Sequence, residues 1–169
     1  MSAAPRKFAE GTGVPVERSR GEIERLLKRH AATGFFYGEQ NDRALIGFEL
    51  GGRRYHMDLH YPPLESYRFM QAGFAGARER NREQMETAQE KEKQRLWRGL
   101  LLLVKAKLEA VADGITTLEM ELQPYTVMPN GQRAGEWLEP QIEHVYQTKR
   151  MSPLLPDARP RAIESEGDR

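Results

Sequence analysis

Three polar residues alternate along residues 51–61, where His56, Asp58 and His60 occupy every second position. In a β-strand, alternate residues project from the same face, and two histidines so placed can share a zinc or iron ion. All three cannot converge on one ion, because each step of two residues moves about 6.5–7 Å along the strand. We therefore treat His56, Asp58 and His60 as weak metal candidates and predict a solvated or interface face instead.

The strand that carries these residues is predicted to belong to a hairpin. Gly51 and Gly52 separate two runs, "RALIGFEL" and "RRYHMDLHY", and such a glycine pair favours a two-residue turn. The resulting register pairs apolar residues on one face: Phe48 with Tyr55, Ile46 with Met57 and Ala44 with Leu59. On the opposite face it pairs mostly polar residues: Glu49 with Arg54, Gly47 with His56, Leu45 with Asp58 and Arg43 with His60. We therefore expect one dry face and one wet face.

Helices are predicted before and after the strands. Ser19 and Glu22 are interpreted as the capping box of an N-terminal helix that ends at Gly34, where "GFFYGEQ" supplies a further strand. Residues 135–150 are predicted to form the last helix. The core face expected for that helix holds Trp137, Leu138, Ile142, Val145 and Tyr146.

A long helix over residues 82–113 is predicted to be the core helix. Its second half carries an apolar stripe at helical spacing: Trp97, Leu100, Leu101, Val104, Leu108 and Val111. Leu102 and Leu103 widen the stripe, so we expect this helix to be covered on more than one side and to lie across the dry face. A capping box at Thr116 and Glu119 then begins another helix. The predicted fold class is α+β: an N-terminal helix, a three-stranded antiparallel sheet, a long core helix packed on the sheet and C-terminal helical elements.

Length and composition indicate one folded domain. A chain of 169 residues has the size of a single domain. Composition predicts a disordered N-terminus at residues 1–13 and a disordered C-terminal tail at residues 152–169, around a single α+β domain at residues 14–151. Residues 64–81 have no sustained period and are predicted to form a long flexible loop.

The sequence excludes several classes of protein. Its longest apolar run, at residues 100–104, is far shorter than the roughly 18–20 residues that span a bilayer, so we expect no membrane partner. No apolar segment typical of a secretory signal opens the chain. The chain has no cysteine, which excludes disulfides and thiol chemistry. A cytoplasmic location fits both observations.

The motifs of common enzymes are missing from the sequence. It contains no phosphate-binding loop, no dinucleotide-binding glycine pattern, no nucleophile elbow and no zinc-protease helix. We therefore predict a protein that is not an enzyme, with no catalytic residues and no cofactor. A metal-dependent enzyme built on His56, Asp58 and His60 is the least favoured alternative.

Basic and aromatic residues gather between residues 67 and 98, which makes this region the best candidate for contact with nucleic acid. The net charge of +1 gives no overall attraction for phosphates, so binding must come from a local patch. Cationic side chains neutralise phosphates, and aromatic rings stack on bases. The candidate residues are Tyr67, Arg68, Phe74, Arg78, Arg80, Arg82, Lys91, Lys93 and Arg95. Glutamates lie among them, so a solvated helix with alternating charges is the other interpretation.

Four segments of the sequence form a recognisable pattern: "VPVERSRGEIERLLKRHAATGFFYG", "RALIGFELGGRRYHMDLHYP", "RLWRGLLLLVKAKLEAVADGITTLEMEL" and "VMPNGQRAGEWLEPQI". In these segments the chain resembles a family of small uncharacterised proteins encoded by bacteriophages and prophages. The segments cover most of residues 14–146. The resemblance implies a role in phage DNA metabolism, counter-defence or control of the host, in the cytoplasm of the bacterial host. It brings no established catalytic residues.

Two functions remain as hypotheses. The first is a phage-encoded, non-enzymatic accessory protein that contacts DNA through residues 67–98 and the wet strand face. The alternative is a protein–protein interaction module or an inhibitor of a host factor, whose partner is a host or phage protein. In this alternative the long helix pairs with the partner, or with its own copy in a homo-oligomer, through Met85, Ala88 and the Trp97 stripe.

Overall fold

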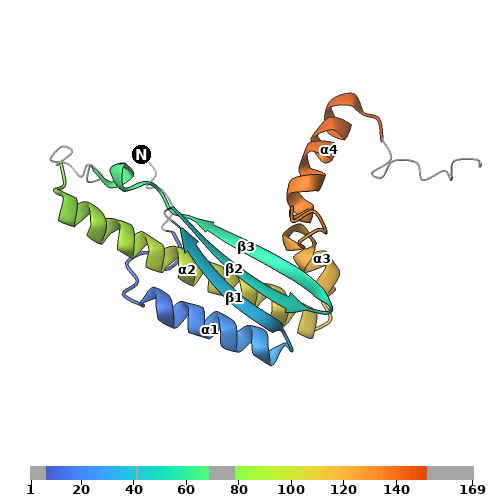
Figure 1. The fold of residues 1–169 in the computed structure, drawn as a ribbon, viewed down its shortest axis with the longest axis horizontal. Helices are drawn as coiled ribbons and strands as arrows, with labels where there is room; N and C mark the ends of the chain where they lie inside the picture. The colour runs from blue at the N-terminus through green and yellow to red at the C-terminus, as the bar shows by residue number, and fades with distance from the viewer. Residues whose placement is uncertain (1–6, 41, 69–78, 152–169) are drawn as a thin grey trace, which may run out of the picture.

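The computed structural model describes residues 7–40, 42–68 and 79–151, and its elements follow the predicted order (Figure 1). The described elements are α1 (Val16–Arg29), β1 (Thr33–Gln40), β2 (Arg43–Leu50), β3 (Arg53–His60), η1 (Leu64–Tyr67), α2 (Arg82–Ala112), α3 (Leu118–Leu122), η2 (Gln123–Tyr125) and α4 (Ala134–Thr148). The fold is α+β, with an N-terminal helix, a three-stranded antiparallel sheet, a long helix and C-terminal helices, as predicted.

The sheet has the strand order β1-β2-β3, and both neighbouring pairs are antiparallel. All seven residue pairs predicted above between β2 and β3 are present, and Leu50 pairs with Arg53 next to the turn. Gly51 and Gly52 form the turn, with φ angles of 57° and 75°. Two consecutive positive φ angles are the signature of a tight hairpin turn, and glycine adopts them without steric cost. The glycine pair therefore set the register that the sequence predicted.

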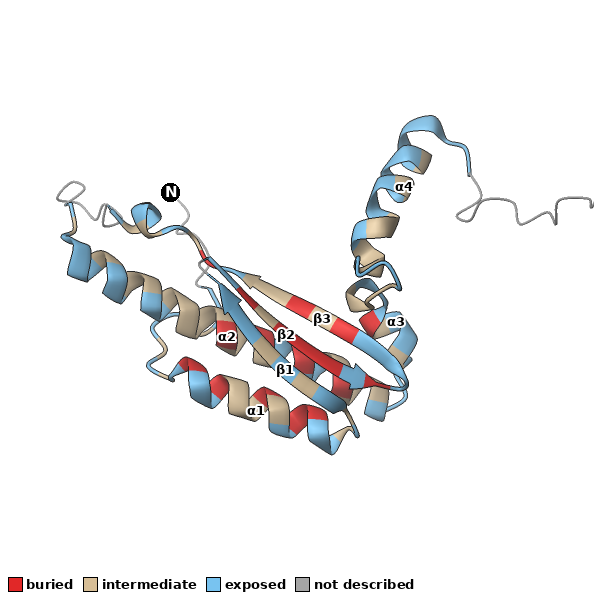
Figure 2. Cartoon of the chain, viewed as in Figure 1, coloured by how far each residue is buried: buried red, intermediate tan, exposed pale blue. Residues whose placement is uncertain are grey.

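The dry face of the sheet is covered by α1 and α2, and the buried residues concentrate where these three parts meet (Figure 2). Trp97 of α2 is 0% exposed, and its Nε1–H donates to the hydroxyl of Tyr61 at 2.8 Å. Its ring also contacts Tyr37 of β1, with the ring centroids 5.6 Å apart. The long helix is thus the core helix. The Trp97 stripe, predicted as a contact surface for a second chain, is already occupied by this core.

The outer side of α2 differs from the prediction. Leu102 and Leu103 are 45% and 39% exposed, so the helix is covered on one side, not on several. The predicted stripe was too wide because four consecutive leucines point around more than half of a helix, whereas the sheet and α1 reach only part of its circumference.

Three predicted helix boundaries were wrong. α1 begins at Val16 with Pro15 as its N-cap, so the proposed capping residue Ser19 lies inside the helix and is buried. α1 ends at Arg29, and the first left-handed residue after it is Ala31, with a φ of 63°; Gly34 also has a positive φ, 61°, but lies within β1 and does not end the helix. α3 is capped by Thr117, whose hydroxyl accepts from the N–H of Met120, and not by Thr116. Capping depends on local backbone geometry, and several polar residues near each helix end fit the same pattern.

The outer segments are described only in part. Residues 7–13 form turns in which the N–H of Glu10 donates to the carbonyl of Lys7 at 3.2 Å, and the N–H of Thr12 to that of Ala9 at 3.0 Å. In the predicted loop at residues 64–81, η1 occupies the beginning, and residues 69–78 lie outside the described part. The division into residues 1–13, 14–151 and 152–169 stays a prediction.

Candidate functional site

The alternating polar residues lie on the outer face of β3, and they do not converge. His60 is exposed at the end of the strand. The carboxylate of Asp58 accepts Arg133 Nη1 at 2.7 Å, which occupies it with an ion pair. Arg133 comes from the N-cap of α4, far away in the sequence. Among the residues that the structure describes, no group of three or more histidines, aspartates and glutamates is placed to hold a metal ion.

His56 makes an aromatic contact. The rings of His56 and Phe36 are edge to face, with their centroids 5.2 Å apart. Burial lowers the pKa of His56 below its ordinary value, and the Asp58 carboxylate opposes this effect only in part. The imidazole is therefore neutral at pH 7, as a ring packed against another ring requires. The wet face thus contains a small aromatic cluster that alternation alone did not reveal.

Most of the candidate cations for nucleic acid are already paired with carboxylates. Their ion pairs are Arg68 with Glu79 at 2.8 Å, Arg82 with Glu86 at 2.9 Å, Lys93 with Glu39 at 3.3 Å and Arg95 with Glu92 at 2.7 Å. The hydrogen bond from Arg95 lowers the pKa of Glu92, so this carboxylate stays charged at neutral pH. Tyr67 lies in η1 beside this region, whereas Phe74 and Arg78 lie outside the described residues. Each ion pair reduces the positive charge that a phosphate would meet.

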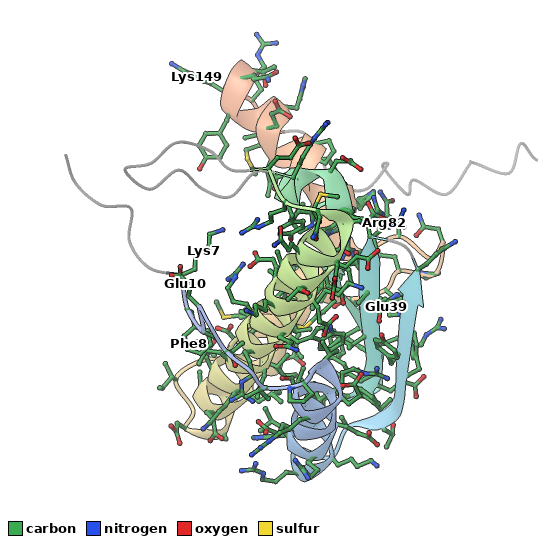
Figure 3. The ribbon with its side chains drawn as sticks, turned by 90° about the vertical axis from the view of Figure 1, so that its left-hand side faces the viewer. Lys7, Phe8, Glu10, Glu39, Arg82 and Lys149 are labelled. Carbon is green, nitrogen blue, oxygen red and sulfur yellow. The ribbon has the colours of Figure 1, made fainter. Side chains whose placement is uncertain are left out.

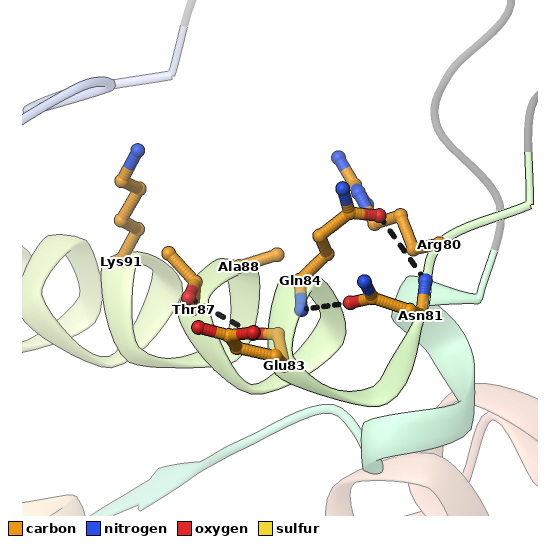
Figure 4. A pocket seen from close by; sticks show the side chains of 7 residues that line it. All are labelled: Arg80, Asn81, Glu83, Gln84, Thr87, Ala88 and Lys91. Atoms are coloured by element: carbon orange, nitrogen blue, oxygen red, sulfur yellow. Dashed lines mark hydrogen bonds between the residues drawn. The ribbon is translucent and has the colours of Figure 1, made fainter.

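Two of the candidate cations share one depression at the beginning of α2 (Figure 4). Arg80 and Lys91 extend from the same side of the helix over a hollow of about 440 Å³. Within the described ranges Lys91 has no ion pair, and Arg80 donates to the carbonyl of Tyr67 at 3.1 Å. The helix end itself is capped, because the side chains of Asn81 and Gln84 each accept from the other's backbone N–H. The depression is open and mostly polar.

A more apolar hollow lies where α4 leaves the body of the protein. This α4 groove has a volume of about 390 Å³. Its apolar lining comes from Met128, Ala134, Trp137 and Leu138, and Arg53 and Glu119 lie at its polar margin. The groove exists because Thr126 pairs with Tyr55 at the free edge of β3, and Val127 then pairs back with Arg133. This short turn directs α4 away from the sheet (Figure 1).

The predicted core face of α4 was wrong. No residue of α4 is buried, and this helix packs mainly against η2. Ile142 is 39% exposed and Tyr146 is 81% exposed. Trp137, Leu138 and Val145 are half-buried. An amphipathic stripe has the same spacing whether the chain's own core or a second molecule covers it, so the sequence could not distinguish the two.

The comparisons with known proteins add no family. No family model, no curated protein and no solved structure matches the chain. The helices of the described part include none that is both long enough and apolar enough to cross a membrane.

Proposed function

We propose that this chain is a non-enzymatic protein–protein interaction module, and that α4 with its groove is the contact surface. The observation that carries the proposal is the exposure of the apolar side of α4, which projects from a body whose own core is complete without it. Folded proteins rarely expose contiguous apolar surface, and where they do, the surface is commonly an interaction site. The helix presents this surface in the form that helix-in-groove recognition uses.

The proposal includes a biological context. The resemblance to proteins of phages and prophages suggests an accessory protein in the cytoplasm of a bacterial host, with a host or phage protein as partner. An inhibitor of a host factor is one form that such a module takes. The wet strand face fits this non-enzymatic function, because Asp58 is paired with Arg133 and His56 packs against Phe36.

Nucleic-acid binding is the second candidate. The observation that favours it is the common direction of Arg80 and Lys91 over one depression (Figure 4). Two cations supply far less than the 6–10 phosphate contacts of a typical strong DNA-binding protein. The four carboxylate pairs nearby weaken this candidate further.

A photo-crosslinking experiment tests the proposal. We would replace Ile142 by a photoreactive phenylalanine analogue in the full chain, irradiate it in an extract of bacteria that carry the gene, and separate the products by mass. We expect discrete protein adducts, because residue 142 lies in the middle of the exposed apolar surface. The matched control carries the analogue at Lys28, whose side chain is 64% exposed on α1.

Three outcomes contradict the proposal or separate it from the second candidate. The absence of protein adducts from position 142 contradicts it, and so do equal yields from positions 142 and 28. Adducts that no longer form when the extract is treated with nuclease before irradiation indicate that nucleic acid brings the two proteins together, which favours the second candidate. Adducts that survive nuclease support a direct protein contact.

A further inference from the structure

One edge of the sheet is covered and the other is open. At the outer edge of β3 the N–H of Val127 donates to the carbonyl of Arg54 at 2.8 Å, and Thr126 pairs with Tyr55. β1 forms the opposite edge, and no segment of the described residues pairs with its outer side. An unpaired edge presents a row of backbone donors and acceptors that a further strand can use. The outer edge of β1 is therefore available to an added strand.

The register shows which backbone groups of β1 face outward. The carbonyl of Arg54 points away from β2, and the direction of the backbone groups alternates from residue to residue along an antiparallel strand. Through the registers of both strand pairs, this alternation places the N–H and C=O groups of Tyr37 and Glu39 on the outer side of β1. The beginning of β1 is irregular, because its register shifts between Thr33 and Phe36. The regular part of the edge thus lies around Tyr37 and Glu39.

Arg20 of α1 lies beside this part of the edge with an unpaired charge. Its Cζ is 3.3 Å from the centre of the Tyr37 ring, close enough for a cation–π contact. The side chain is half-buried, and within the described part of the chain it has no ion pair and no hydrogen-bond partner. A guanidinium stacked on a ring keeps the N–H groups at its rim free, and their planar arrangement matches a carboxylate.

Two carboxylates of the same region already have other cationic partners. Glu39 lies between the sheet and α2 (Figure 3), where it pairs with Lys93 at 3.3 Å and accepts the hydroxyl of Tyr37. Glu24, one turn further along α1, pairs with Lys28 at 2.6 Å. Arg20 is therefore left for a negative charge from another molecule.

We propose that an extended peptide with an acidic residue adds to β1 as a fourth strand and places its carboxylate on Arg20. Side chains directly opposite each other in neighbouring strands share a face of the sheet. The peptide residue opposite Tyr37 therefore lies on the dry side, beside the guanidinium that rests on that ring. The residues next to it lie on the wet face near Phe36, which is 44% exposed, so an apolar residue fits there. This surface is separate from α4 and its groove.

The position of α1 favours a peptide over a second copy of the chain. In Figure 1 α1 runs along the β1 side of the sheet, and it packs mainly against α2. A two-fold pair of β1 strands would bring the second copy's α1 to the same side of the junction, where the two helices compete for space. A peptide brings no such helix, so α1 forms a floor under the added strand.

Selection from a phage-displayed library on the purified full chain tests the inference. The library holds random peptides of about seven residues, the length of a short strand. We expect the enriched peptides to share an acidic residue next to an apolar one. The same selection on the Arg20→Gln variant should lose the acidic preference.

A selected peptide is then labelled with a fluorophore, and anisotropy measures its dissociation constant. We expect a micromolar value, because the contact is far smaller than a standard interface. Arg20→Gln should raise the constant about tenfold, since a charge-assisted pair is lost. Arg25→Gln is the matched control, because Arg25 is an exposed arginine of the same helix with no ion pair among the described residues, and it should leave the constant unchanged. Thermal unfolding of both variants shows whether they are folded.

Amide hydrogen exchange, measured by nuclear magnetic resonance, tests where the peptide lies. The N–H groups of Tyr37 and Glu39 face outward in the free chain, and the peptide should slow their exchange at least about tenfold. The N–H of Gly38 already belongs to the ladder with β2, so it serves as the internal control.

Several outcomes overturn the inference. A selection that enriches no peptide does so, as do enriched peptides without an acidic residue and binding that Arg20→Gln leaves unchanged. Slow exchange at Tyr37 and Glu39 that depends on protein concentration without peptide shows that a second copy occupies the edge, which overturns the assignment to a peptide. Peptides that bind without slowing exchange at these residues occupy another surface. If that surface is the α4 groove, the proposed function stands and this inference fails.

Discussion

On the wet face of the sheet, Gly47 leaves the space that the ring of Phe36 occupies. A methyl group at this position would lie 2.0 Å from Cε1 and Cζ of Phe36, because the phenylalanine ring rests directly on the glycine backbone. The ring of Phe36, in β1, thus reaches across β2 to the ring of His56 in β3. Only a residue without a side chain at position 47 lets the exposed ring of Phe36 lie in this place.

Replacing Gly47 by Ala should destabilise the protein by about 1–3 kcal/mol, the usual cost of inserting a group into occupied space. Urea unfolding measures this free energy. Gly38→Ala is the control, because nothing lies within 4 Å of a Cβ built there, and it should leave stability nearly unchanged. In a Phe36→Ala background the same Gly47→Ala change should add almost nothing. Equal effects of Gly47→Ala with and without Phe36 would contradict the proposed clash.

At the residue scale, the sequence predicted which residues share a face of a strand, and it did not predict contacts between residues far apart in the chain. Alternation along β3 and the glycine turn were enough to place His56, Asp58 and His60 on the wet face. The partner of Asp58 could not be predicted, since Arg133 reaches it only because a later turn folds along the edge of β3. Contacts between residues far apart in the chain depend on the tertiary path, which no local pattern contains.

At the scale of elements, one ion pair joins the two helices that cover the sheet. Nη1 of Arg98 in α2 lies 2.7 Å from Oε2 of Glu22 in α1, and both side chains are 27% exposed. This hydrogen bond lowers the pKa of Glu22 below its ordinary value of 4.5, although burial acts in the opposite direction. The ionised form of Glu22 therefore stabilises the folded state, and its contribution is present above about pH 4.5 and is lost as the pH falls through the lowered pKa.

Arg98→Met should lower the free energy of unfolding by about 1 kcal/mol at neutral pH, and the difference from the unchanged chain should shrink as the pH falls toward about 3. Urea unfolding at several pH values gives this comparison. Arg18→Met is the matched control, because Arg18 also contacts Glu22, at 3.2 Å, but its side chain is 70% exposed. A loss from Arg98→Met that is the same at every pH would show that packing of the arginine stem, and not charge, joins the helices.

Element type and order were predictable, and element ends were not. The apolar stripe around Trp97 and the alternation in β2 and β3 are long, so they identify helix and strand clearly. After α1 both Ala31 and Gly34 adopt a positive φ, at 63° and 61°, but the helix has already ended when the chain reaches Ala31, although glycine is the better residue for that conformation. Leu26 and Leu27, near the end of α1, belong to the buried core, and the local sequence does not show how they pack there.

At the scale of the whole molecule, a layered body and a projecting helix are separate structural parts. The buried cluster extends from Val16 to Leu122 and includes no residue of α4. The predicted core face of α4 failed because a pattern of apolar spacing says that a helix has a covered side, without saying which molecule covers it.

Ending the chain after Gln132 should leave the body folded. We expect cooperative thermal unfolding with a Tm within about 5 °C of the full chain, because none of the contacts that are lost belongs to the buried core. They are the ion pair of Arg133 with Asp58, the pairing of Arg133 with Val127, the hydrogen bond from the N–H of Ala134 to the carbonyl of Thr126, and the groove contacts. Circular dichroism at the helix band measures the transition. Loss of cooperative unfolding would mean that α4 belongs to the core, and the interaction proposal would lose its basis.

The two tryptophans of the chain divide between these parts, Trp97 in the sealed core and Trp137 in the wall of the α4 groove. The molecule therefore carries two tryptophan fluorophores, one that senses unfolding of the body and one that senses occupation of the groove. With Trp97 replaced by Phe, the emission of the remaining indole reads the groove alone. With Trp137 replaced by Phe instead, the emission of Trp97 reports whether the core is folded. Binding and folding can then be followed as separate fluorescence signals.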